Sequence, residues 1–192
     1  MKSIIKTGII YIICIPVYIF NKYLVHLIRK ANSIMVSRGI KTGKNVILHG
    51  NGQILGKENL VIEDNVRIGN NYFLFALGGI RIGRNTQISR NVCIYSSNHN
   101  YESDLSIPYD NTYINKPVVI EESCWIGMNV NIIPGVRLGK GCIVAMGSTV
   151  TQDVEPFTIV GGSPARPIGK RKKLNLFNEE PKKEFGSVFP KD

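Results

Sequence analysis

The sequence lacks several features that would assign it to a class at once. No two of its four cysteines have the Cys-x-x-Cys spacing, and no helix-turn-helix, zinc-finger or RNP-like motif is present. Nucleic acid is therefore the least supported partner, despite a formal net charge of +10. No small-x-small cleavage site follows Phe20, which argues against a cleaved signal peptide. The scattered cysteines fit a reducing, cytoplasmic setting.

Acidic residues are absent before Glu58, whereas nine Lys or Arg residues occur there. Residues 8–20 (GIIYIICIPVYIF) form an unbroken apolar run. This run is shorter than the ~20 helical residues that cross a bilayer, and Pro16 disfavours a straight helix. Two interpretations stay open for residues 1–30: a segment that packs on the protein's own body, or a helix with basic flanks that binds a membrane surface.

Aliphatic residues recur with a period of six over most of the remaining chain. They are Ile62, Ile68 and Leu74; Ile82, Ile88 and Ile94; and Ile120, Ile126, Ile132, Leu138, Val144 and Val150. Three residues after nearly every one stands a turn former, namely Asn65, Asn71, Asn85, Asn91, Ser97, Ser123, Asn129, Gly135, Gly141 or Gly147. A helix does not keep a period of six on one face, so the pattern predicts short strands separated by corners.

The period of six has a direct structural meaning. Residues two apart on a strand share one face, so both point inward, and Asn and Gly tolerate the positive φ of a tight corner. Three strands and three corners make a triangular coil of about 18 residues, and coils stack at the ~4.8 Å spacing of paired strands. We therefore predict an all-β parallel β-helix over residues 44–168, with Cys124 and Cys142 as small buried core residues.

The flanking regions and one insertion complete the expected organisation. An apolar and basic helical segment occupies residues 1–43, and a basic tail occupies residues 169–192. The repeat slips by two residues between Leu74 and Ile82, and it breaks from 97 to 117 (SNHNYESDLSIPYDNTYINKP). A long loop leaving a regular scaffold is more often functional than decorative. His99 stands at its base and suits proton transfer near neutral pH; the alternative is a histidine that faces solvent.

The repeat also carries a family resemblance. Ile68-Gly69, Ile82-Gly83, Ile126-Gly127 and Leu138-Gly139 share one motif, and residues 116–168 (KPVVIEESCWIGMNVNIIPGVRLGKGCIVAMGSTVTQDVEPFTIVGGSPARPI) resemble the C-terminal half of the hexapeptide-repeat acetyltransferases. The likeness is greatest to the maltose, galactoside and polysaccharide O-acetyltransferase branch and covers about residues 44–170. It implies left-handed winding, which the period alone does not give, and a homotrimer whose sites have walls from two subunits.

By this resemblance the chain moves an acetyl group from acetyl-CoA to a saccharide hydroxyl, as in surface polysaccharide biosynthesis. His99 is then the general base, and the backbone N–H of Met128 stabilises the tetrahedral oxyanion. The implied acetyl-CoA contacts are Trp125, Ala145, Met146, Gly147, Thr151, Gln152, Arg166 and Lys170. Asn71 matches an acceptor-binding asparagine of the family, although its corner position also explains it.

Two departures from the family and four alternative functions remain. Asn100 stands where the family often has Asp, so the group that orients His99 stays open among Glu102, Asp104 and Asp110, and Gln152 stands where a Lys is frequent. The acceptor could instead be serine, an antibiotic or an amino sugar, or the prism could be a scaffold without catalysis. The histidines at 26, 49 and 99 do not suggest a three-His metal site, so we predict no catalytic metal. The expected location is the cytoplasm, at the inner face of the cell membrane.

Overall fold

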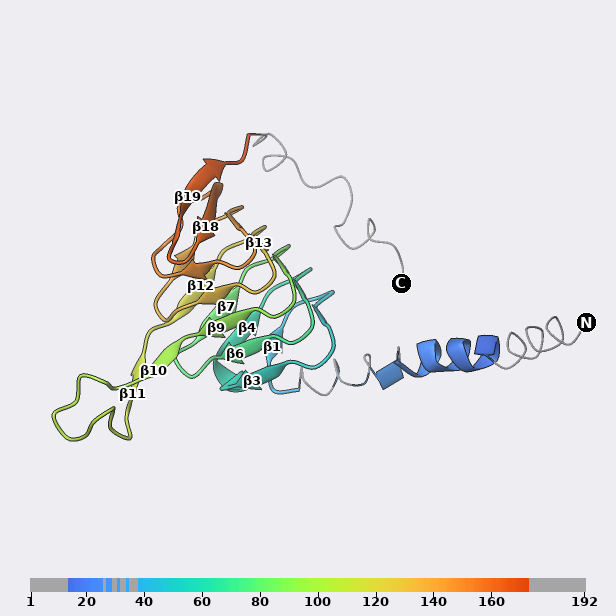
Figure 1. The fold of residues 1–192 in the computed structure, drawn as a ribbon, viewed down its shortest axis with the longest axis horizontal. Helices are drawn as coiled ribbons and strands as arrows, with labels where there is room; N and C mark the ends of the chain where they lie inside the picture. The colour runs from blue at the N-terminus through green and yellow to red at the C-terminus, as the bar shows by residue number, and fades with distance from the viewer. Residues whose placement is uncertain (1–13, 26, 29–30, 32–33, 35–37, 173–192) are drawn as a thin grey trace, which may run out of the picture.

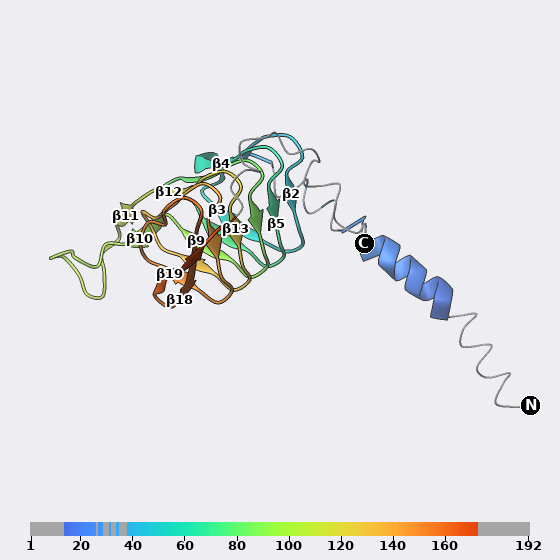
Figure 2. The ribbon, with the colours of Figure 1, turned by 90° about the horizontal axis from the view of Figure 1, so that it is seen from above.

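A computed structural model describes residues 14–25, 27–28, 31, 34 and 38–172. From residue 41 the chain winds into stacked coils that form a three-sided prism (Figures 1 and 2). Each coil contributes one short strand to each of three parallel sheets, which we call faces A, B and C in the order in which the chain visits them. The predicted all-β class and the parallel β-helix are confirmed.

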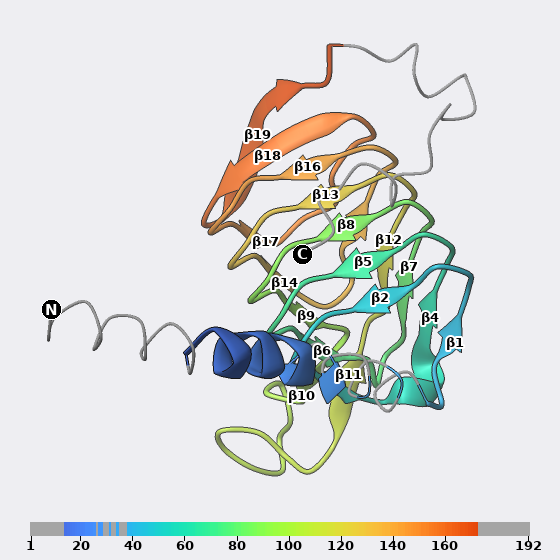
Figure 3. The ribbon, with the colours of Figure 1, turned by 90° about the vertical axis from the view of Figure 1, so that its right-hand side faces the viewer.

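The strands of each face are hydrogen-bonded from coil to coil. Face A contains β1 (Lys41–Thr42), β4 (Leu60–Ile62), β7 (Ile80–Ile82), β12 (Val118–Ile120) and β15 (Arg137–Leu138). Face B, at the front of Figure 3, contains β2 (Ile47–Leu48), β5 (Arg67–Ile68), β8 (Gln87–Ile88), β13 (Trp125–Ile126), β16 (Ile143–Val144) and β18 (Thr158–Gly162). Face C contains β3 (Gln53–Leu55), β6 (Phe73–Phe75), β9 (Cys93–Tyr95), β14 (Asn131–Ile132) and β17 (Thr149–Val150).

The core consists of inward aliphatic columns. Leu74, Ile94 and Ile132 stack in register on face C and are at most 1% exposed. Removing such a side chain from water stabilises the fold by roughly 1.5–3 kcal/mol. Because every coil repeats the same inward positions, the core is continuous from the first coil to the last.

The predicted corner residues explain how the chain turns. All of them except Ser97 have positive φ, from 57° to 88°. Several asparagines also bond to the corner above or below; the Asn91 Nδ2 donates to the Asn129 Oδ1 at 2.9 Å. The prediction for Ser97 is wrong, because this residue begins strand β10 (Ser97–His99) instead of a corner.

Irregular segments gather on the edge where face C leads to face A, the C–A edge. The 3-10 helix η1 (Lys57–Asn59), the turn at residues 76–79 and the insertion after β9 all lie there. The expected coil length is therefore wrong for the first coils, which are longer: on face A, Lys41 pairs with Val61 and Val61 pairs with Arg81. Arg81 next pairs with Val119, across the whole insertion, and the predicted length is met only in the following coil, where Val119 pairs with Arg137.

The ends of the prism differ by a few residues from the predicted boundaries. Strand β1 begins at Lys41, slightly before the expected start, and β19 (Ala165–Lys170) extends past residue 168 and pairs antiparallel with β18. Residues 14–25 are helical, as expected, with apolar side chains exposed. No helix among the described residues is long and apolar enough to cross a membrane. Residues 1–13, His26 and the predicted tail from 173 onward lie outside the described residues.

Candidate active site

A hairpin protrudes from the C–A edge (Figures 1 and 3), and His99 is at its base as the last residue of β10. Strand β10 pairs antiparallel with β11 (Tyr113–Asn115), which places His99 directly opposite Tyr113. The prediction that residues 97–117 leave the prism is confirmed. The pairing of the two strands at its base was missed, because the apolar residues near it are too few to show a strand pattern.

Two tyrosine rings hold the imidazole of His99. Tyr109 stacks on it with ring centroids 3.9 Å apart and planes inclined by 16°, and Tyr113 lies 4.8 Å away at 32°. The Nδ1 atom is buried and has no hydrogen-bond partner among the described residues. No hydrogen bond joins the ring to Glu102, Asp104 or Asp110 in this part of the chain, so aromatic contacts replace the carboxylate that sequence reasoning sought.

Asp110 instead organises the loop. Its carboxylate accepts hydrogen bonds from the Thr112 N–H at 2.8 Å, the Thr112 Oγ1 at 2.6 Å and the Asn100 Nδ2 at 3.3 Å. The pKa of Asp110 is lowered below 3.8, first by the hydrogen bond from the Thr112 hydroxyl and then by one from the Ser103 side chain. The loop thus folds back at residues 110–112, which brings Tyr109 over His99.

A second set of predicted site residues lies on the edge between faces B and C, the B–C edge. The Met128 carbonyl accepts from the Gly147 N–H at 2.8 Å, so the corners at 128 and 145–147 stack directly. The N–H of Met128 is not among the paired backbone donors of the described residues. An unpaired corner N–H beside the exposed Met146 is a suitable donor for an oxyanion.

The other predicted acetyl-CoA contacts lie at different positions relative to these stacked corners. Trp125 is on face B and 54% exposed, and Arg166 is opposite Gly161 in the terminal hairpin, one coil above Ala145. Lys170 is also exposed in that hairpin. Arg171, in contrast, donates from Nε to the Gly141 carbonyl at 2.5 Å, so it is held to the prism.

One chain does not bring the two halves of the site together. His99 is on the C–A edge, whereas Met128 and Asn71 are on the B–C edge, at the opposite ends of the face C strands. Thr151 and Gln152 follow β17 on the C–A edge, two coils beyond the coil that carries His99. Asn71 has the positive φ (57°) of its corner, and its role in acceptor binding stays a prediction.

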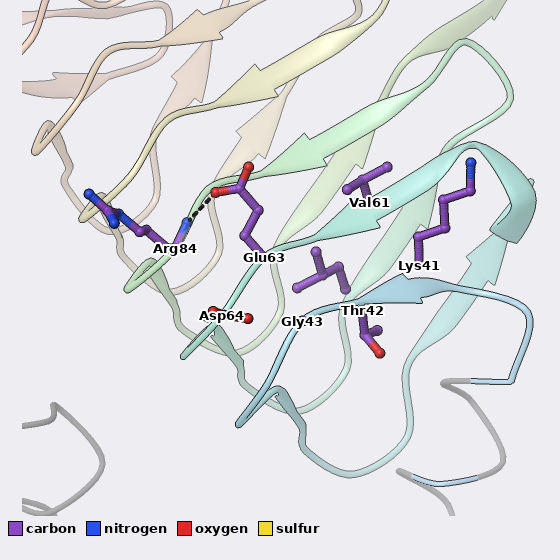
Figure 4. Close-up of a pocket in the computed structure, with 8 residues that line it drawn as sticks. Lys41, Thr42, Gly43, Val61, Glu63, Asp64 and Arg84 are labelled. Atoms are coloured by element: carbon purple, nitrogen blue, oxygen red, sulfur yellow. Dashed lines mark hydrogen bonds between the residues drawn. The ribbon is translucent and has the colours of Figure 1, made fainter.

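A hollow of about 400 Å³ lies beside β1 and β4, in the first coils of the prism (Figure 4). Both of its carboxylates are paired: the Glu63 carboxylate accepts from the Arg84 N–H at 3.1 Å and from Arg81 at 2.5 Å. The Asp64 carboxylate accepts from the Lys44 N–H at 2.6 Å. These bonds tie neighbouring coils together, so the hollow has a structural explanation. Among the described residues, no three His, Cys, Asp or Glu side chains cluster as metal ligands would.

Comparisons with known proteins agree with this architecture. Residues 117–152 match the family described as "Bacterial transferase hexapeptide (six repeats)", and residues 59–96 match "Hexapeptide repeat of succinyl-transferase". The "Putative colanic acid biosynthesis acetyltransferase WcaF" of Escherichia coli strain K12 is 31% identical over 133 residues, which cover 69% of this chain and 70% of that protein. The "Putative lipopolysaccharide biosynthesis O-acetyl transferase WbbJ" of the same strain is 29% identical over 150 residues, 74% of each chain.

A shorter match and a solved structure complete the comparison. "Putative acetyltransferase C18B11.09c" of Schizosaccharomyces pombe is 36% identical over 91 residues, so this chain covers only 43% of that protein. The hexapeptide-repeat acetyltransferase VCA0836 of Vibrio cholerae O1 biovar eltor, complexed with acetyl coenzyme A, superimposes with a TM-score of 0.66 at 30% identity. That alignment covers 75% of this chain and 79% of the other.

Proposed function

Because this chain belongs to the hexapeptide-repeat acetyltransferase family, we propose that it transfers the acetyl group of acetyl-CoA to a saccharide hydroxyl in the biosynthesis of a surface polysaccharide. The observation that carries the proposal is His99, in contact with the rings of Tyr109 and Tyr113 at the base of the hairpin. The names of WcaF and WbbJ support a polysaccharide acceptor, and the acetyl coenzyme A complex of VCA0836 supports the donor.

The proposed reaction is a direct transfer. The His99 imidazole takes the proton of the acceptor hydroxyl, and the hydroxyl oxygen attacks the thioester carbonyl carbon. The carbonyl oxygen becomes an oxyanion that accepts a hydrogen bond from the Met128 N–H. As the C–S bond breaks, the coenzyme A thiolate leaves and takes up the proton held on His99. No acyl-enzyme is needed, because Cys124 and Cys142 are buried in the core.

We propose that the enzyme is a homotrimer. His99 and Met128 lie on different edges of one prism, so a complete site requires His99 of one protomer to face Met128 of a neighbouring copy. A threefold arrangement repeats this contact and closes on itself. In that site, acetyl-CoA lies along the stacked corners at 128 and 145–147, with Trp125 beside the pantetheine and Thr151 and Gln152 as further contacts. The exposed cations of Arg166 and Lys170 suit its phosphates.

We also propose that residues 1–30 bind the inner face of the cell membrane, where a lipid-linked acceptor would be found. Ile19, Phe20 and Tyr23 are at least 60% exposed on the helix at 14–25, beside Lys22. Exposed apolar side chains with basic flanks favour anionic lipid. Replacing Ile19 and Phe20 by Glu should abolish flotation with phosphatidylglycerol vesicles, whereas Leu105→Glu, on the exposed loop, should not. Flotation of all three proteins alike would contradict this location.

Thiol release from acetyl-CoA tests the catalytic proposal. Wild type, His99→Ala and the control His49→Ala are compared on a panel of mono- and oligosaccharides, serine, chloramphenicol and amino sugars. We expect sugar-dependent release that falls about a hundredfold or more in His99→Ala and survives in His49→Ala. Release that is equal in His99→Ala would refute the base. Binding of acetyl-CoA with release only on another acceptor would exclude the saccharide, and failure to bind acetyl-CoA would favour a scaffold.

A further inference from the structure

We propose that the outer surface of face C, from Phe73 to His99, is a platform that binds an acceptor of more than one sugar ring. The platform is a chain of aromatic contacts: Phe73 to Tyr95 at 5.5 Å, Tyr95 to Phe75 at 5.2 Å, Phe75 to Tyr113 at 6.2 Å and Tyr113 to His99 at 4.8 Å. This inference rests on the proposed function, because it names the kind of acceptor that His99 serves.

The rings point away from the core. Leu74 and Ile94, between them in sequence, are fully buried, and alternation along a strand sends their neighbours outward. Leu55, Phe75 and Tyr95 are in register on β3, β6 and β9, so they form one outward row. The core therefore does not account for these aromatic residues, and an exposed apolar row of this kind marks a binding surface.

Face A shows what an ordinary outer face of this prism looks like. There, the outward Arg81 pairs with Glu63 and the outward Arg137 pairs with Glu121, so salt bridges join neighbouring coils. The outward residues of β3, β6 and β9 on face C carry no charge. One face is thus solvated by charges, while the other presents rings next to the proposed base.

The chemistry of this surface suits a saccharide. The C–H bonds of a pyranose make one side of the sugar apolar and weakly positive, which suits the negative face of an aromatic ring. Tyr95 and Tyr113, 39% and 45% exposed, add hydroxyl groups at the rim, as expected for a ligand site that is mainly apolar. The rings lead directly to His99, which takes the acceptor proton in the proposed reaction, because Tyr113 contacts both Phe75 and His99.

The path of rings is longer than one sugar. Beyond His99 it runs through three further contacts of 4.8, 6.2 and 5.2 Å before it reaches Tyr95. A monosaccharide at His99 would leave Phe73 and Tyr95 without a role, whereas an oligosaccharide with its reacting hydroxyl at His99 would extend over them. Tyr95 and Phe73 should therefore matter for long acceptors only.

The test compares glucose with maltotriose, and N-acetylglucosamine with chitotriose, in full-length protein. We expect a lower KM for the trisaccharides, and Tyr95→Ala or Phe73→Ala should raise that KM about tenfold while kcat and the monosaccharide KM change less than about twofold. Val119→Ala, which removes an outward apolar side chain from face A, is the matched control and should retain the preference.

Other outcomes would overturn the platform. The first is equal KM values for mono- and trisaccharides in wild type, and the second is an unchanged preference for trisaccharides in Tyr95→Ala and Phe73→Ala. The third is a lower molar mass of these variants in light scattering, which would make the surface an interface between copies. Binding can be measured without catalysis through the NMR line broadening of maltotriose when the His99→Ala protein is added, and this separates the two proposals. If broadening depends on Tyr95 although no acetyl transfer occurs in wild type, the platform stands and the proposed reaction fails.

Discussion

The imidazole of His99 stacks on the phenol ring of Tyr109, which comes from the far side of the loop. Tyr113 makes a second, tilted contact with the imidazole, while Nδ1 makes no hydrogen bond among the described residues. Ring contacts fix the plane of an imidazole through packing rather than through a charged partner. The loop is thereby coupled to the proposed base.

Tyr109 is accordingly expected to position His99. Tyr109→Phe keeps the ring and should leave kcat within about twofold, whereas Tyr109→Ala frees the imidazole and should lower kcat about tenfold. The pH profile of kcat/KM should also move in Tyr109→Ala, because the surroundings of the base change; a purely structural role would leave that profile in place. Equal kcat values for the Phe and Ala variants would contradict this role.

The Asp110 carboxylate should titrate below its ordinary value. Its pKa is lowered by bonds that only the ionised form accepts in full, so its contribution to loop order is present above pH 3.8 and is lost as the pH falls through the lowered value. An NMR titration should give a midpoint below 3.8 in folded protein. Thr112→Val should raise the midpoint, since the Thr112 hydroxyl is the largest cause; an unchanged midpoint in that variant would disprove the assignment.

Replacing either of two corner glycines by alanine should destabilise the fold, but for different reasons. A Cβ at Gly127 would lie 2.6 Å from the Met146 nitrogen in the next coil, so Gly127→Ala should force coils apart and destabilise the protein by about 3 kcal/mol or more. Gly147 has open space around it but a φ of +71°, so Gly147→Ala should cost only about 1–2 kcal/mol. Urea unfolding measures both, and a larger loss in Gly147→Ala would reverse the interpretation.

Thiol labelling should follow depth in the prism. Burial raises the pKa of Cys93, so less of its thiolate is present at a given pH, and its labelling should require a higher pH than that of an unperturbed thiol. Cys142 is buried, and its hydrogen bond to Cys124 together with burial raises its pKa. We expect Ellman's reagent to react first with the exposed Cys14 and with Cys124 and Cys142 only on unfolding. Rapid loss of all four thiols in native protein would contradict this order.

Much of the fold was predictable because each six-residue repeat contains both its inward residue and its corner residue. Asn71 and Asn129 mark corners that their conformation confirms, and Leu74 and Ile132 mark the inward column. The same logic failed at Ser97, where a turn former enters a strand because it pairs with Asn115 at the other end of the insertion. A local period carries no information on such a distant partner.

The candidate site was less predictable for the same reason. His99 is a predicted base because the family resemblance and its position beside the break in the repeat point to it together. The contacts with Tyr109 and Tyr113, however, depend on how an irregular loop folds back, which no period encodes. The placement of His99 and Met128 on separate edges follows only once the three faces are assembled in space.

The insertion on the C–A edge has a consequence for how such a chain can change. On face B the chain returns from Gln87 to Trp125 only after passing through the whole insertion, yet Trp125 pairs with Gln87 in the same register as Ile143 pairs with Trp125. The register between successive coils is therefore independent of the length of the insertion at one edge of the prism. Lengthening or rewriting that edge leaves the other two edges in place. The hairpin can therefore be replaced by another insertion, in evolution or by design, without a change in the β-helix that carries it.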